Sequence, residues 1–483
     1  MSPFILLVCL IVHTIAIDII GILSLLFLRP WGPRVHRLVN GSTIANWLES
    51  LNCLLPSSTL ISYGDAIPSE KNSYGSLFSG SSSSSLVSSS SADTSPTPAL
   101  FSSTDPGIII CNHQVDMDWY YLWGLLIQSK RHGQIRIILK DTLKYIPVLG
   151  LAMQFAGFIF VRRDWQKDGK QLRKQMEQIV VHKIPAMLLI FPEGTTINTQ
   201  AQEKSRKYSI QESRPLFNYL LLPRSTGFST ILSSLSGASP VVYDITMAYD
   251  GYTGEIPTYE MGYERNKDHN IPNAGKILRG HHTVVHMDVA TFSAKDIGPT
   301  VEEWLDYRWL RKECLLSYFA KHQKFPETEE DLVNIDIEDL FPSQELLEEE
   351  KNINKDFDLS RIERMKSLIT KKDLIVGKKR IAKSEGNQNS LIFLWMVVLL
   401  SVIILPFALM LFIPYSLIIT ISYSYIKWHE YTRGMLSREE KMIKKETIMF
   451  RVFKVAAVIF MIGTLLAWAY STYSLLSSFF NFA

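Results

Sequence analysis

Two long apolar segments limit what this chain of 483 residues can fold into. The first runs from Pro3 to Leu28 and is interrupted only by His13, Thr14, Asp18 and Ser24. The second, Leu391 to Ile426, would be ~54 Å long as one helix, against ~30 Å of bilayer core. We therefore expect an N-terminal membrane anchor and a C-terminal hairpin or re-entrant pair broken at Pro406 and Pro414, with another possible span from Phe453 to Phe480.

Basic residues flank these segments. Arg29, Arg34 and Arg37 follow the first segment, and clusters of Lys and Arg lie on both sides of the second. The positive-inside rule places these flanks, and the domain between them, on the cytosolic side. No small-residue cleavage site follows Leu28, which favours a retained anchor over a signal peptide. A glycosylated Asn40, in the sequon "NGS", would overturn this orientation.

Charge and cysteine content exclude several function classes. The net charge is only +3, so nucleic acid is not an expected partner. The four cysteines lie far apart without metal-ligand spacing, which indicates neither a zinc site nor a disulfide framework. A reducing environment facing the cytosol fits this composition, and no metal is predicted.

Composition divides the chain into six segments. We expect an anchor with its basic flank, an entry segment, a disordered Ser-rich insertion around Ser73 to Ser103, an ordered domain, an acidic then basic linker, and a membrane region. Their predicted bounds are 1–38, 39–72, 73–105, 106–325, 326–388 and 389–483.

Short β-rich runs alternate with helical patterns in the ordered domain, which predicts an α/β fold. Strands are predicted at "GIIIC", "IRIIL", "GFIFV", "AMLLIF" and "VVYDITMAY", and helices at Trp119–Ser129, Lys167–His182 and Val301–His322, with a helical stretch ending at Phe155. The acidic tract from Glu327 to Asp356 is interpreted as a solvated linker.

The stretch "CNHQVDMDWYYLW" is the first candidate for chemistry. His113 follows a predicted strand and Asp118 lies in the first turn of the next helix, so the carboxylate can reach back to the imidazole. Such a pair makes a general base, because the carboxylate fixes the tautomer while the other ring nitrogen accepts a proton. A helix cap with a satisfied polar pair is the structural alternative.

In two further segments, polar residues lie at the end of a predicted strand. In "FPEGT", Glu193, Gly194 and Thr195 follow a buried strand, where an open α/β sheet places its ligand, although a simple turn is the alternative. In "GFIFVRR", the arginines suit a phosphate, although a charged strand end is the alternative.

Taken together, the order NHx4D, GxxFxxR, FPEGT and a later apolar-Pro segment resembles the glycerolipid acyltransferase family typified by the 1-acylglycerol-3-phosphate acyltransferases. The matching blocks are Asn112–Asp118, Gly157–Arg163, Phe191–Thr195 and Leu222-Pro223, within about Gly107 to Asp250. "MDWYYLW", "KSRKY" and "PRSTGF" resemble the lysocardiolipin and lysophosphatidylinositol acyltransferase branch, although Leu222 stands where that branch often has His. The family fold is α/β, a mixed sheet flanked by helices.

This resemblance implies an acyl-CoA-dependent transfer to a lysophospholipid in the membrane, with the endoplasmic reticulum as the expected compartment. By resemblance, His113 deprotonates the acceptor hydroxyl and Asp118 orients it, with acyl-CoA as co-substrate and no further cofactor. The substrate-binding residues implied in the same way are Arg163 for the phosphate, and Glu193, Gly194, Thr195, Asn112 and Pro223.

Three alternatives remain open within and outside the family. Lysophosphatidic acid is a second acceptor, a CoA-independent transacylase of the tafazzin kind is a second donor chemistry, and a non-catalytic lipid-binding scaffold is a different class. A hydrolase is disfavoured, because the sequence has no GxSxG elbow and no positioned cysteine.

Overall fold

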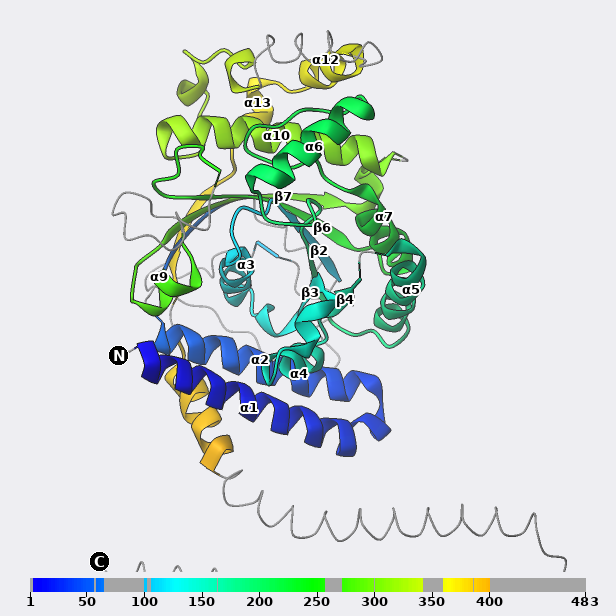
Figure 1. Ribbon diagram of the computed structural model, residues 1–483, viewed down its shortest axis with the longest axis vertical. Helices are drawn as coiled ribbons and strands as arrows, with labels where there is room; N and C mark the ends of the chain where they lie inside the picture. Colours follow the sequence, from blue (N-terminus) through cyan, green and yellow to red (C-terminus); the bar gives the residue numbers. More distant parts are fainter. Residues whose placement is uncertain are drawn as a thin grey trace, which may run out of the picture. The chain divides into compact units, whose positions relative to one another are not determined.

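The computed structural model describes residues 3–55, 58–64, 100–101, 106–162, 164–256, 272–298, 300–341, 359–384 and 386–399. Contacts divide the chain into two units, Met1–Leu394 and Trp395–Ala483. The elements below belong to the first unit (Figure 1). The Ser-rich insertion and the predicted C-terminal spans lie largely or wholly outside the described residues.

An eight-stranded mixed sheet forms the centre of this unit, in the order β4-β3-β5-β2-β6-β7-β1-β8. The first five strands of that order are mutually parallel, whereas β6–β7 and β1–β8 pair antiparallel. This confirms the α/β fold with a mixed sheet. The strands are β1 Thr59–Tyr63, β2 Gly107–Cys111, β3 Ile135–Lys140, β4 Ile159–Val161, β5 Met187–Ile190, β6 Val241–Tyr249, β7 Val284–Ser293 and β8 Lys379–Lys383.

The sequence "GIIIC" forms the central strand β2 because every one of its residues is buried. A parallel strand covered on both faces is an apolar run rather than an alternating pattern. On one face, α5, α7 and α10 pack through one hydrophobic cluster, and in Figure 1 α3 lies inside the curve of the sheet. The helices of the domain include α3 Asp118–Ile127, α4 Leu149–Phe155, α5 Trp165–Val181, α6 Thr199–Gln211, α7 Ser225–Ser234 and α10 Val301–His322.

Helix α10 is attached to the sheet by buried ion pairs. Arg308 and Lys312 each approach Asp244 of β6 at 2.6 Å, and Arg311 approaches Asp288 of β7 at 2.5 Å. Removing one partner of such a pair would leave a buried charge without compensation. These ion pairs fix the rotation of α10 about its own axis, and this rotation determines which of its side chains face the site described below.

The N-terminal segment folds into a helical hairpin, α1 Pro3–Phe27 and α2 Pro33–Leu54, with α4 packed beside α1 (Figure 1). Residues Phe4–Phe27 are long and apolar enough to cross a membrane. The polar interruptions of α1 are all buried. Ser24 Oγ lies 2.9 Å from His36 Nδ1 and Ser50 Oγ lies 3.3 Å from His13 Nδ1, so polar groups of α1 pair with α2.

The sheet recruits strands from outside the range 106–325 expected for the domain. β1 comes from the predicted entry segment and β8 from the predicted linker, where they pair with each other at the edge of the sheet. Part of the acidic tract also differs from a solvated linker. Leu332, Leu340 and Phe341 are buried in the cluster around α10, because these apolar residues recur between the acidic ones.

Asn40 cannot report on membrane orientation in the expected way. It is 3% exposed in the middle of α2, and its amide lies 3.4 Å from His36 Nε2. A glycosyl group needs an exposed acceptor, so an unmodified Asn40 is expected whichever side of the membrane it faces.

Candidate active site

His113 lies in the turn between β2 and α3, at the carboxyl end of the central strand. Its Nδ1 is 2.9 Å from Asp118 Oδ2, and the Asp118 side chain is fully buried whereas that of His113 is 18% exposed. The carboxylate therefore holds Nδ1, which leaves Nε2 available to a hydroxyl that reaches the ring. The predicted pairing of these two residues is present in the structure.

Asp118 is held by more groups than the imidazole. Its Oδ2 accepts hydrogen bonds from the backbone N–H groups of Gln114 at 2.7 Å and Val115 at 3.1 Å, and its Oδ1 accepts one from the hydroxyl of Tyr249. Burial and the charge of Asp118 raise the pKa of Tyr249 well above its ordinary value, so this hydroxyl keeps its proton and donates. These donors fix the position of the Asp118 carboxylate next to the imidazole.

Glu193 supports the His113 turn from the other side of the site. Its carboxylate accepts hydrogen bonds from Trp309 Nε1 at 3.2 Å, His113 N at 3.4 Å and Leu221 N at 3.4 Å. Burial raises the pKa of Glu193 well above its ordinary value, and these donors oppose that shift. The ring of Phe191 stacks on His113 with centroids 4.0 Å apart, which fixes the imidazole plane.

Only some of the remaining predicted site residues lie at a cavity. Thr195 and Pro223 line a polar cavity beside Glu193, and Gly194, at φ +75°, turns the chain between them. Asn112 lines none of the cavities described here, because its amide is bonded to both the N–H and the C=O of Met247. Arg163 lies outside the described residues.

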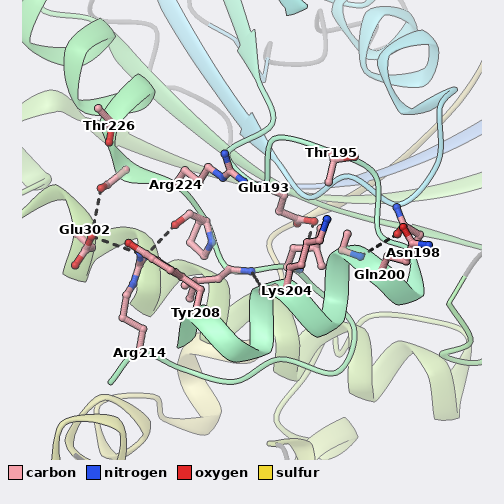
Figure 2. A pocket seen from close by; sticks show the side chains of 16 residues that line it. Glu193, Thr195, Asn198, Gln200, Lys204, Tyr208, Arg214, Arg224, Thr226 and Glu302 are labelled. Atoms are coloured by element: carbon pink, nitrogen blue, oxygen red, sulfur yellow. Dashed lines mark hydrogen bonds and ion pairs between the residues drawn. The ribbon is translucent and has the colours of Figure 1, made fainter. Parts of the chain in front are cut away.

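The polar cavity has a volume of about 740 Å³ and lies between the "FPEGT" loop, α6 and the start of α7. Arg224, directly before α7, and Lys204 of α6 line the same cavity as Glu193 (Figure 2). Neither of these two cations has an ion-pair partner within the described part of the chain. Arg214, in contrast, is neutralised by Asp306 at 2.6 Å and Glu302 at 3.4 Å. The cavity therefore suits an anionic polar group.

A second cavity, of about 500 Å³, is lined almost entirely by apolar side chains. Its walls come from α1, α2, α4 and the start of α3, where Met117 and Trp119 flank the catalytic candidate Asp118. The polar cavity reaches Glu193, which bonds to the backbone of His113. Residues next to the His113–Asp118 pair thus contribute to both an apolar cavity and a polar cavity.

Cys111 is the only cysteine next to His113 in sequence, and it is buried at the end of β2. Burial raises the pKa of its thiol well above the ordinary value, so it remains protonated and is a poor nucleophile. Among the described residues, no group of three or more His, Cys, Asp and Glu side chains is arranged to hold a metal ion.

Sequence reasoning missed several groups that complete this site. Tyr249, Trp309 and Phe191 each contact His113, Asp118 or Glu193, although Tyr249 lies 131 positions from Asp118 and Trp309 lies 116 positions from Glu193. The one available signal was that Tyr249 and Phe191 each adjoin or end a predicted strand whose carboxyl end lies near that of β2.

Comparison with known proteins connects this geometry to a family. Residues 91–250 match the acyltransferase family model. Lysocardiolipin acyltransferase 1 of Danio rerio is 34% identical over 215 residues, which cover 44% of this chain and 52% of that protein. An uncharacterised acyltransferase of Schizosaccharomyces pombe is 31% identical over 224 residues, which cover 45% of this chain and 61% of that protein.

A plant relative carries the name of the 1-acylglycerol-3-phosphate acyltransferases, which the motifs of this chain also resemble. The 1-acyl-sn-glycerol-3-phosphate acyltransferase 2 of Brassica oleracea is 27% identical over 236 residues, which cover 48% of this chain and 56% of that protein. The chain spans between about half and three fifths of the length of the curated relatives it matches.

Proposed function

We propose that this chain, whose residues 91–250 match the acyltransferase family model, transfers a fatty acyl group from acyl-CoA to a glycerol hydroxyl of a lysophospholipid. One observation carries the proposal: an apolar cavity reaches Met117 and Trp119 on either side of Asp118, and a polar cavity reaches Glu193, which bonds to the backbone of His113. An amphipathic acceptor and a long acyl chain need that combination of surfaces.

In the proposed reaction, His113 Nε2 removes the proton of the acceptor hydroxyl as its oxygen attacks the thioester carbonyl. The carbon–sulfur bond then breaks, and the imidazolium returns the proton to the departing CoA thiolate. Asp118 stabilises the imidazolium through Nδ1, as in other histidine bases. A covalent acyl-enzyme is unnecessary because the thioester is already activated.

The apolar cavity is the proposed site of the acyl chain. Ala152, Ile137 and Trp123 are among its lining residues, and a chain that leaves water for such a wall gains about 0.8 kcal/mol per methylene. The acceptor's polar part is proposed to occupy the other cavity, with Arg224 and Lys204 at its phosphate. Arg163, Gly194, Thr195 and Pro223 are kept as proposed substrate-binding residues, whereas Glu193 and Asn112 are proposed to position the loops around them.

The acceptor is proposed to be a mature lysophospholipid such as lysophosphatidylinositol, which would make the enzyme one of phospholipid remodelling. The lysocardiolipin acyltransferase relative supports this preference. Lysophosphatidic acid is the second candidate, supported by the 1-acyl-sn-glycerol-3-phosphate acyltransferase relative. The apolar helix α1 supports attachment to a membrane, proposed to be the endoplasmic reticulum with the domain facing the cytosol.

The test is acyl transfer in isolated membranes that contain the full chain, with labelled acyl-CoA and a panel of lysophospholipids. His113→Ala should abolish transfer while the protein still reaches the membrane. His281→Ala is the matched control, because His281 is an exposed histidine that lines none of the cavities described here. Transfer only to lysophosphatidic acid would select the second candidate, and equal transfer by wild type and His113→Ala would refute the mechanism. Absence of transfer to any acceptor would favour a lipid-binding scaffold.

A further inference from the structure

Two arginines converge on Gly157, in a part of the domain that shares no lining residue with the polar cavity. Arg37 comes from α2, Arg136 from β3, and Gly157 from the turn between α4 and β4. A Cβ atom at Gly157 would lie 2.7 Å from Arg37 Nη1 and 2.8 Å from Arg136 Nε. Two features favour glycine at this position. Its φ is +78°, and the guanidinium groups occupy the space that a side chain would need.

The positive charges of these two arginines are not compensated. Neither guanidinium has an ion-pair partner among the residues that the structure describes, although Arg136 is 5% exposed. Burial and the charge of Arg37 lower the pKa of Arg136 to about 9, and burial with the charge of Arg29 lowers that of Arg37. Both remain cationic at neutral pH, and buried like charges are costly unless an anion joins them.

A cavity of about 310 Å³ opens in front of these guanidinium groups. The one acid among its described lining residues, Asp141, is occupied by Lys144 at 2.6 Å. Amide side chains supply much of the remaining polar wall, and Gln175 Oε1 is buried there without a hydrogen-bond partner. Cations beside amides suit a phosphate that carries hydroxyl groups nearby.

The surroundings of the cavity indicate where such a phosphate would come from. Tyr145, next to the lining residue Lys144, is 71% exposed, and Ile146, Leu149 and Leu151 also expose apolar side chains. The outer face of α1, which packs against α4, is exposed and apolar as well. A membrane that covers this apolar surface would bring its phosphate layer to the level of the basic flank of α1.

We propose that Arg37 and Arg136, around Gly157, form a binding site for the phosphate of an anionic phospholipid headgroup, separate from the site of acyl transfer. The bound phosphate neutralises the two guanidinium groups and joins the α1–α2 hairpin to the β3–β4 edge of the sheet. The lipid thereby holds the hairpin, which forms part of the apolar cavity, in place against the domain. This role does not depend on turnover at His113.

The experiment measures thermal stability of the purified full chain in detergent, titrated with phosphatidylglycerol in mixed micelles, with phosphatidylcholine, or with inorganic phosphate. Phosphatidylglycerol should raise the melting temperature, and Arg37→Gln should weaken its apparent affinity about tenfold, which corresponds to loss of a charge-assisted hydrogen bond. Arg37→Lys, which keeps the charge, should weaken it less. Arg34→Gln is the matched control, since Arg34 is exposed on the same helix.

Each outcome separates the site from its alternatives. Equal loss of affinity in Arg34→Gln and Arg37→Gln would mean general surface attraction and would overturn the proposal. Stabilisation by inorganic phosphate alone, with the same dependence on Arg37, would support the phosphate site but overturn the lipid as its source. His113→Ala should retain full stabilisation by phosphatidylglycerol, so failure of the acyl-transfer proposal would leave this result unchanged.

Discussion

Removing the hydroxyl of Tyr249 should impair turnover although Tyr249 itself contacts no proposed substrate site. The hydroxyl donates to Asp118 Oδ1, and both side chains are buried. A hydrogen bond to a charged group contributes about 2 kcal/mol, and water cannot replace it at a fully buried oxygen. If the whole of this ~2 kcal/mol serves to hold the carboxylate in the position that stabilises the transition state, its loss lowers kcat/KM roughly thirtyfold. Tyr249→Phe is therefore expected to lower kcat/KM between about fivefold and thirtyfold, with the rest of the effect in stability.

A double-mutant cycle in the acyl-transfer assay tests this reasoning. Asp118→Asn can keep the bonds of Gln114 and Val115 through its amide oxygen, so the variant should fold yet transfer acyl groups about a thousandfold more slowly. Because Tyr249 acts through the charge of Asp118, Tyr249→Phe should cause little further loss in the Asp118→Asn background.

Tyr63→Phe is the control for simple loss of a buried hydroxyl. Tyr63 is also fully buried, and its hydroxyl lies 3.2 Å from His286 Nδ1, away from Asp118. It should reduce the melting temperature but leave kcat/KM within about twofold. Additive effects of Tyr249→Phe and Asp118→Asn, or an equal activity loss in Tyr63→Phe, would refute a role through the carboxylate.

Three other changes test the cavities and the buried charges. Ala152→Phe should narrow the apolar cavity and shift acyl-CoA preference to shorter chains, at about fourfold in kcat/KM for each excluded methylene, as measured with a chain-length series. Arg224→Gln should raise KM for the lysophospholipid about tenfold with a smaller effect on kcat, whereas Lys207→Gln, exposed on α6, should change neither. Burial raises the pKa of Glu313 to about 8 from 4.5, so its contribution to stability is complete below about pH 4.5 and is lost as pH rises through 8. Glu313→Gln should therefore remove about 2 to 3 kcal/mol of the decrease in unfolding free energy between pH 6 and 8, measured by denaturant titration.

Most of the central sheet could be predicted from the sequence because its parallel strands are continuous apolar runs. "GIIIC" and "VVYDITMAY" match β2 and β6, and the amphipathic pattern at 301–322 matches α10. Strands β1, β7 and β8, at one end of the sheet order, were missed. Three of the five residues in "KRIAK" are charged, and the pairing of this strand with β1 joins residues more than 300 positions apart, which no local pattern predicts.

The contact between His113 and Asp118 could also be predicted, because only five positions separate them and a strand-to-helix turn supplies the geometry. The residues that hold this pair in place could not be predicted. Tyr249 and Trp309 reach the site only through the register of β6 with β2 and the ion pairs that fix α10. Local patterns predict local pairs, whereas these contacts depend on the packing of the whole sheet.

The polar residues on the inner side of α1 make this helix more than an interchangeable membrane attachment. His13 and Ser24 are matched to partners on α2, and Leu7, Leu10 and Ile17 form part of the apolar cavity. An unrelated apolar helix of equal length would keep the protein on a bilayer but would leave the cavity with a mismatched wall. If the apolar cavity selects acyl chains by length, as proposed, substitutions on the inner face of α1 would change that selection. Substitutions on its outer face would be limited only by the need to remain apolar.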